Sequence, residues 1–354
     1  MRRMQLDNIK PGMRLAKAIF TSDGRVLLTS GIELKDNYIE RLRTQGINDI
    51  FIEDEISAGV EIPEVICEGT RLEAKAIVKN LMDDRNFAGS INSGRVKEII
   101  NKIMDELLSN RDVLVNLSEI KSVDDYTFEH SVNVCVLSLI TGIGLGFNIN
   151  RLKDLGIGAI LHDIGKLKIP EEILKKPSQL SVEEFEEIKK HTIYGYEILK
   201  DNSNISMVSA FIAFGHHERY DGSGYPLQLR GENIHQCARI VAVADVYDAL
   251  TSDRVYRRKL RPHEVVEYIT SLGSHHFDKD IVEQFIKYIA VYPVGTGVVL
   301  NTRERGLVVR VEKSMPTRPV VKIIYNEKGQ KLINYSEIDL SKKLNIHVVD
   351  SCEL

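Results

Sequence analysis

The sequence has no tryptophan and only four cysteines in 354 residues. These cysteines, at positions 67, 135, 237 and 352, lie far apart and form no CxxC pair. Isolated thiols favour a reduced, intracellular protein over one with a disulfide framework. The N-terminal residues MRRMQLDNIKPG also lack the apolar core of a secretory signal. We therefore expect a cytoplasmic protein.

Long apolar runs and a strong excess of one charge are also missing. The longest apolar stretch, residues 134–147, is shorter than the roughly 20 residues that a membrane-spanning helix needs. It predicts a buried helix, with no membrane insertion. The formal net charge of −4 gives no electrostatic reason to bind long nucleic acid. A local cluster of arginine and lysine could still hold a small anion.

The periodicity of apolar residues changes along the chain and predicts four parts, in a mainly α-helical protein. Residues 1–65 are predicted to form a small β-rich module for regulation or interaction, and residues 66–118 a helical connector. Residues 119–290 read almost entirely as helix, as in an antiparallel helical bundle. Residues 291–354 alternate with period two, which predicts a small β-domain, either a sheet or a barrel.

Local signals support this division. In the first module, Asp23-Gly24 predicts a hairpin, Asp36 is expected to cap a short helix, and that helix should end at Gly46. In the bundle, Ser181 and Glu184 form the pattern of a capping box. The amphipathic connector helices fit either packing on the bundle or a homodimer surface, and the β-modules are candidates for binding signalling partners.

Acidic and imidazole side chains recur at a steady interval in the helical region. Successive anchors are about 25 to 32 residues apart, which is the length of a helix, a connection and a returning helix. A bundle with this rhythm would bring all of them to one level of its core. The residues are His130, His162, Asp163, His191, His216, His217 and Asp245.

The setting of each anchor argues against chance. His162 and Asp163 end an apolar helix, where a bare carboxylate would suffer a large desolvation penalty without a partner. His216 and His217 can serve one site only if their helix ends there, since adjacent residues on a helix point about 100° apart. Asp245 interrupts an otherwise apolar helix. Such a mixture of imidazole and carboxylate suits iron or manganese, and seven ligands imply two ions, with Asp163 as the bridging carboxylate.

The motifs HDIGK at 162–166 and HHERYDGSGYP at 216–226 resemble the HD-GYP family of metal-dependent phosphohydrolases. The resemblance covers residues 119–290 and includes VADVYDALTSDRVYR and HFDKDIV. It implies a helical fold that hydrolyses cyclic di-GMP to pGpG, and in some members on to GMP. By resemblance, the seven anchors are the metal ligands, and a hydroxide bridging two ions attacks the phosphodiester.

The resemblance also implies roles around the metals. Asp163 and Lys166 would be catalytic, with Lys166 holding a phosphate oxygen. Gly222, Gly224, Tyr225 and Pro226 would shape the substrate pocket, where Tyr225 could stack on a guanine or bond a phosphate. Arg254 and Arg257 would contact phosphate, and if the preceding helix continues they share one face.

One departure concerns the metal count. Some family members use a glutamate four residues before the first histidine ligand to hold a third metal, and here Tyr126 occupies that position. We therefore expect two divalent ions. The remaining histidines, at positions 235, 263, 275, 276 and 347, are expected to be structural, and Asp248 and Asp278 to be packing or capping residues.

Two other functions remain open from the sequence. The protein could hydrolyse a different nucleotide, such as a mixed cyclic dinucleotide or a guanosine polyphosphate. Alternatively, it could be a catalytically weak member that binds a cyclic dinucleotide and signals through its flanking modules. Degenerate members generally lose metal ligands, whereas this chain keeps all seven.

Overall fold

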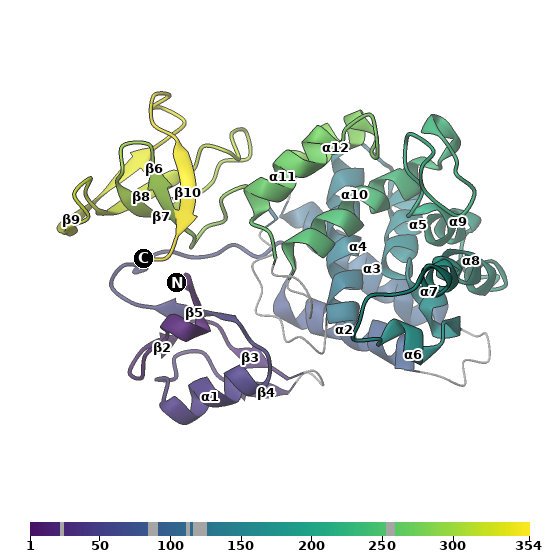
Figure 1. Ribbon diagram of the computed structural model, residues 1–354, viewed down its shortest axis with the longest axis horizontal. Helices are drawn as coiled ribbons and strands as arrows, with labels where there is room; N and C mark the ends of the chain where they lie inside the picture. Colours follow the sequence, from purple (N-terminus) through teal and green to yellow (C-terminus); the bar gives the residue numbers. More distant parts are fainter. Residues whose placement is uncertain (22–24, 84–90, 111–113, 116–125, 253–258) are drawn as a thin grey trace.

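A computed structural model describes the chain from Met1 to Leu354, except residues 22–24, 84–90, 111–113, 116–125 and 253–258 (Figure 1). It shows a helical body with a small β-module at each end of the chain, which confirms the predicted fold class. The domain boundaries at 65, 118 and 290 stay predictions.

The helical body is built around α4 (Tyr126–Gly144), which packs against α2, α5, α10 and α12. From Glu129 to Gly142 the residues of α4 are buried on every side, as expected for a helix that is apolar all round. The other helices are α2 (Glu68–Asp83), α3 (Ser93–Ser109), α5 (Ile149–Ile160), α6 (Glu171–Leu174), α7 (Val182–Lys189), α8 (His191–Lys200), α9 (Met207–Gly215), α10 (Gln236–Thr251), α11 (Pro262–Ser271) and α12 (Lys279–Ile286).

The predicted connector helices α2 and α3 are part of this body. Their apolar residues belong to the same hydrophobic core as α4, α5 and α10. On α3, for example, Ile99, Ile100 and Ile103 are almost fully buried, and Ile100 lies against Gly156 of α5. Packing on the bundle is therefore confirmed, and it occupies the apolar faces of both helices.

Two helices end earlier than expected. The capping box at Ser181 and Glu184 indicates a helix, and its apolar pattern would let that helix run on to Lys200, but it breaks at Lys190, so His191 is the first residue of α8. The Ser181–Glu184 capping box at its start is confirmed. Helix α10 ends at Thr251 and Ser252 has an extended backbone, so α10 does not continue towards Arg254 and Arg257.

The N-terminal module combines two small sheets with one helix. Strands β1 (Arg2–Gln5), β5 (Asp49–Glu53) and β2 (Arg14–Leu15) form an antiparallel sheet, and β3 (Ile19–Phe20) pairs with β4 (Val26–Leu28). This pairing confirms the hairpin, although its Asp23-Gly24 turn lies outside the described residues.

Helix α1 (Asp36–Thr44) follows in that module, with Gly46 just beyond its end at a φ of 70°. The predicted cap was wrong by one residue. Lys35 is the N-cap and Asp36 already begins the helix, where its negative charge favours the positive end of the helix dipole.

The C-terminal domain is a five-stranded antiparallel sheet in the order β10-β6-β7-β8-β9. Four strands lie where the period-two alternation is clear, whereas β9 (Lys331–Asp339) shows little of it because its residues are mostly polar and exposed at the sheet edge. The predicted strands are β6 (Gly297–Leu300), β7 (Arg305–Arg310), β8 (Val320–Tyr325) and β10 (Val348–Cys352).

The two β-modules contact each other, and both chain ends lie between them (Figure 1). The guanidinium of Arg2 donates a 2.7 Å hydrogen bond to the carbonyl of Leu354. Ile56 and Val60 of the first module pack with Val294 and Leu307 of the second. Among the described residues, no helix is long and apolar enough to cross a membrane.

Candidate metal centre

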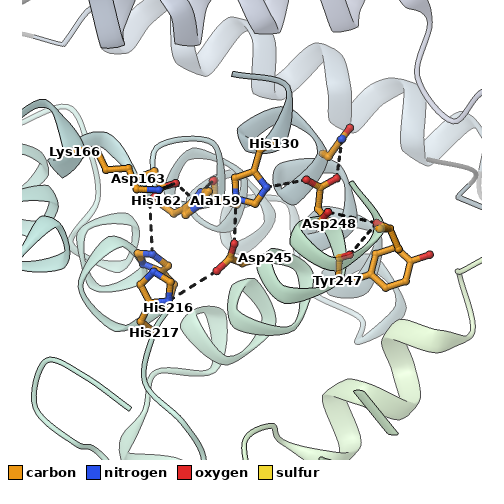
Figure 2. A network of polar contacts seen from close by, with 12 residues as sticks. His130, Ala159, His162, Asp163, Lys166, His216, His217, Asp245, Tyr247 and Asp248 are labelled. Carbon is orange, nitrogen blue, oxygen red and sulfur yellow. Dashed lines mark hydrogen bonds and ion pairs between the residues drawn. The ribbon is translucent and has the colours of Figure 1, made fainter. Parts of the chain in front are cut away.

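The seven predicted ligands converge in the middle of the helical body, from helices that are far apart in sequence. Figure 2 labels six of them, all except His191. His130 lies in α4 and Asp245 in α10. The His-Asp pair 162–163 follows the end of α5, His191 begins α8, and the His-His pair 216–217 follows the end of α9. The helix ends place these side chains in the core, as the sequence predicted.

The ligand atoms form two adjoining groups, within each of which they all lie within 4.8 Å of one another. Each group alone has enough donors to hold a metal ion. The first group is Asp163, His191, His216 and His217, and the second is His130, His162 and Asp245.

Two carboxylates lie between the groups. Oδ1 of Asp163 is 3.5 Å from Nε2 of His191, while its Oδ2 is 3.3 Å from Nε2 of His162 in the other group. Asp245 is arranged in the same way, with Oδ1 3.0 Å from Nε2 of His130 and Oδ2 3.9 Å from Nδ1 of His217. The geometry thus suits Asp163 as a bridge, and it offers Asp245 as a second residue facing both groups.

Backbone carbonyls fix the orientation of three histidine rings. Nδ1 of His162, His191 and His216 lies 2.7, 2.7 and 2.9 Å from the carbonyl oxygen three residues earlier in the chain. A proton on Nδ1 donates this bond and leaves Nε2 with a free lone pair directed into the site. Nε2 of His162 is buried and has no hydrogen-bond partner among the described residues. An unpaired buried nitrogen among carboxylates is what a metal ligand requires.

In the first group the surroundings favour neutral histidines and an ionised aspartate. Burial lowers the pKa of His191, of His216 and, to about 3, of His217. Burial alone would raise the pKa of Asp163, but the charge of Lys166 beside it holds this pKa well below its usual range. Neutral imidazole and ionised carboxylate are the forms that bind metal, so this group needs little proton release to do so.

His130 differs from these histidines because two carboxylates hold its ring. Burial opposes its protonation, but hydrogen bonds with Asp245 and Asp248 outweigh burial and raise its pKa to about 9. Oδ2 of Asp248 accepts from Nδ1 at 2.7 Å. The expectation that Asp248 only packs or caps was therefore wrong. Asp248 lies one turn after Asp245 on α10, a spacing that could have indicated that both face the same ligand.

Glycine is required where the HDIGK segment crosses α8. A Cβ on Gly165 would overlap the carbonyl of His191 and the amide of Gly195. This contact fixes the distance between the segment that carries Asp163 and the helix that begins with His191. Lys166 points back into the site, and its Nζ donates a 2.5 Å hydrogen bond to Oδ2 of Asp163.

The GYP loop lies against the first metal-binding group. The ring of Tyr225 stacks on that of His217, with centroids 4.8 Å apart, so one of its faces is already covered. Gly222 has a φ of 83°, and a Cβ on Gly224 would overlap the backbone of residues 217–219. Gly224 and Tyr225 therefore lie beside the ligand His217, whereas Gly222 lies against Gln228 and Arg230, and Pro226 follows Tyr225 in the chain.

A residue that the sequence did not indicate holds this loop. Glu218 is 3% exposed, and its carboxylate accepts hydrogen bonds from the backbone N–H groups of Leu227 at 2.7 Å and Leu229 at 3.0 Å. The chain that follows the GYP motif is therefore fastened to the residue directly after His217.

Some of the remaining residues named from the sequence lie outside the described regions, and the others lie outside the two metal-binding groups. Arg254 and Arg257, and the side chain of Tyr126, lie outside the described residues. Asp278 caps α12 and bonds Arg239, and His235 caps α10, as expected of structural residues. The histidines at 263, 275, 276 and 347 do not belong to either metal-binding group.

Comparison with known proteins gives one family match to the helical body and one to the C-terminal domain. A model described as "HD domain" matches residues 96–281, and one described as "KOW domain associated with HD domain" matches residues 297–354. Among solved structures, an HDG"Y"P protein from Bdellovibrio bacteriovorus has 15% identity and a TM-score of 0.47, and covers 80% of this chain and 97% of its own.

Curated relatives are phosphodiesterases by name. A "Cyclic di-GMP phosphodiesterase" of Pseudomonas aeruginosa is 32% identical over 76% of this chain and 65% of its own length. One of Thermotoga maritima is 38% identical over 54% and 52%, respectively. A "3'3'-cGAMP-specific phosphodiesterase 1" of Vibrio cholerae is 39% identical over 46% and 37%. The chain thus spans less than two thirds of the length of these relatives.

Proposed function

This chain belongs to the HD domain family, in its HD-GYP branch, and from that membership we propose that it is a metal-dependent phosphodiesterase that hydrolyses cyclic di-GMP to pGpG. The observation that carries the proposal is the division of the seven ligands into two adjoining groups, with Asp163 between them. A two-metal arrangement is well suited to phosphodiester hydrolysis.

Each group of side chains would hold one divalent ion. When bound, such ions supply an activated water and neutralise charge that develops on the phosphate. We propose iron or manganese because the donors are imidazole and carboxylate. We propose two ions because there are two groups and because Tyr126 stands at the position of the third-metal glutamate.

The chain itself contributes a cation and a shaped loop. Lys166, once its hydrogen bond to Asp163 is relaxed by metal, would place its ammonium against a phosphate oxygen. Tyr225 presents its second face beside His217, where a guanine could stack or a phosphate could accept its hydroxyl proton. Arg254 and Arg257 are proposed to contact phosphate because of their place in the family pattern.

A second substrate is supported by one of the relatives. The name of the Vibrio cholerae protein specifies 3'3'-cGAMP, and its 39% identity to this chain is close to the 38% of the Thermotoga maritima relative. Both substrates present the same phosphodiester to the site and differ in one base. The proposal that the protein is only a sensor is less well supported, because all seven ligands are present and converge.

The flanking modules are proposed to bind signalling partners. A homodimer through residues 66–118 would have to use the polar outer faces of α2 and α3, because their apolar faces are packed in the core.

The test is to load the purified protein with Mn²⁺ or, without oxygen, with Fe²⁺, and to separate the products of cyclic di-GMP, 3'3'-cGAMP and cyclic di-AMP by chromatography. We expect linear dinucleotide from cyclic di-GMP at the highest kcat/KM. The double variant His162→Ala, Asp163→Ala should lose both metal and turnover, whereas His276→Ala, outside the two groups, should keep both. Metal-loaded protein that turns over none of the three substrates would overturn the proposal.

A further inference from the structure

A chain of buried polar side chains connects α2 to the metal centre. Nη1 of Arg71 donates a 2.8 Å hydrogen bond to Oδ1 of Asn133 on α4. Nδ2 of Asn133 donates a 2.8 Å bond to Oδ1 of Asp248 on α10. The other oxygen of Asp248 accepts from Nδ1 of His130 at 2.7 Å. The path from helix α2 to a predicted ligand therefore consists of three hydrogen bonds of normal length.

All four residues are removed from water. Arg71 is 5% exposed, His130 4%, Asn133 1% and Asp248 0%. A buried guanidinium carries a desolvation cost of several kcal/mol, which only hydrogen bonds and charge pairing can offset. An apolar helix contact would be the simpler way to pack α2 on α4, so the arginine at this position calls for another reason.

The direction of each bond gives that reason. Because the guanidinium can only donate, it fixes the oxygen of the Asn133 amide towards α2 and its NH₂ group towards Asp248. Asp248 then keeps one oxygen for the N–H on Nδ1 of His130. This holds the ring in the orientation in which Nε2 faces the metal-binding group, 3.0 Å from Asp245.

We propose that Arg71 is a positioning residue for His130. Helix α2 would then support metal binding, although it lies before the region matched by the HD domain model. This inference rests on the proposed metal site. If Arg71 is lost, the buried oxygen of the Asn133 amide loses this donor, so the amide is no longer held in one orientation and its bond to Asp248 weakens. Asp248 then holds His130 less firmly, and the group of His130, His162 and Asp245 binds metal more weakly.

A matched control lies one turn further along α2. Lys75 also faces α4, with its Nζ 3.9 Å from the carboxylate of Glu129, and its side chain is 13% exposed. Lys75 forms this ion pair with Glu129, which is not one of the four residues of the path. Lys75→Met therefore removes the same charge from the same helix face without removing a bond in that path.

The experiment measures Mn²⁺ binding to the full chain by chelator competition, together with the metal content after desalting. For Arg71→Met we expect one of two Mn²⁺ ions to bind about 10- to 100-fold more weakly, the usual cost of losing an outer partner of a ligand. The other ion, at His191, His216 and His217, should be unaffected. Arg71→Lys, which keeps a donor for Asn133, should restore binding to within about threefold, and Lys75→Met should match the unmodified chain.

Thermal unfolding in EDTA shows whether each variant is folded before metal is added. If Arg71→Met does not fold, Arg71→Gln takes its place, since its side chain stays polar but is two bonds shorter and does not reach Asn133. Unchanged affinity for both ions in the folded variant, or equal weakening by Lys75→Met, overturns the inference and leaves the proposed function standing. If the unmodified chain binds no metal, the proposed metal centre itself fails.

Discussion

Oδ1 of Asp245 lies 3.0 Å from Nε2 of His130, so the carboxylate bonds the same nitrogen that faces the metal-binding position. With Asp248 on the other nitrogen, this bond raises the pKa of His130 to about 9, despite burial. In the other group, burial lowers the pKa of His217 to about 3. Protons should therefore compete with metal for His130 but hardly for the histidines of the other group.

Metal loading should depend on pH in only one group. Below pH 9 a proton must leave His130 before metal binds, so affinity at that group should rise by up to about tenfold per pH unit between pH 6 and 9. Burial lowers the pKa of the histidines in the other group, so they need to release few protons and the affinity of that group should be nearly constant. Titrating Mn²⁺ at pH 6, 7, 8 and 9 by calorimetry, in buffers of different ionisation enthalpy, measures both trends. Two ions with the same pH dependence would contradict this prediction.

Gly165→Ala should destabilise the fold and disturb the first group together. The added Cβ would overlap the backbone of α8 at His191 and Gly195, which are not flexible side chains. Forcing a methyl group into such a contact costs about 1–3 kcal/mol of unfolding free energy. Denaturant unfolding of the metal-free protein measures this loss, and the Mn²⁺ content reports on His191.

Gly69→Ala in the first turn of α2 is the control for that change. A Cβ there meets no described atom within 4 Å, so the unfolding free energy should stay the same or rise slightly. Equal stability of both variants would show that the close approach at Gly165 is not required.

The sequence predicted those features that depend on short stretches of chain. Helix ends at His162 and His216 follow from local apolar runs and glycines, and the spacing of anchors along successive helices brings them to one level of the core. The hairpin of β3 and β4 follows from the local Asp23-Gly24 signal in the same way.

The features that the sequence did not predict depend on contacts between distant segments. Asp248 and Asn133 act on His130 only because α10 packs on α4, and Arg71 is one of many charged residues on an amphipathic helix until α2 is placed. Strand β9 has too few apolar residues for period two to be visible. It forms at the sheet edge because its partner β8 supplies the backbone hydrogen bonds. Pattern alone does not carry this information.

Glu218→Gln should weaken substrate binding more than it slows turnover. The carboxylate accepts two backbone N–H bonds that hold the chain after Pro226, whereas an amide offers one acceptor and turns a donor towards the other N–H. Losing one bond to a charged group costs about 1.5–3 kcal/mol, so we expect KM for cyclic di-GMP to rise at least about tenfold with kcat within about threefold. Steady-state kinetics at fixed Mn²⁺ measures the two constants separately.

Asp221→Asn is the matched change within the same loop. Its carboxylate accepts local bonds from Ser223, including one from the N–H at 2.9 Å, and an amide oxygen can accept that bond equally well. KM should therefore stay within about twofold. If Glu218→Gln instead lowers kcat alone, or lowers the metal content, the carboxylate supports the ligands rather than the loop.

Lys166→Met should separate catalysis from metal binding. Nζ lies 2.5 Å from Asp163, and an ammonium has no lone pair with which to bind metal, so both ions should still bind. If the ammonium stabilises charge that develops on the phosphate, its loss should lower kcat about 100- to 1000-fold. Lys168→Met, on the same segment but paired with Glu197 at 3.3 Å and largely exposed, should keep full activity. A Lys166→Met protein that loses metal as well as turnover would show that the lysine serves Asp163 rather than the substrate, because it then acts by holding the bridging carboxylate in place.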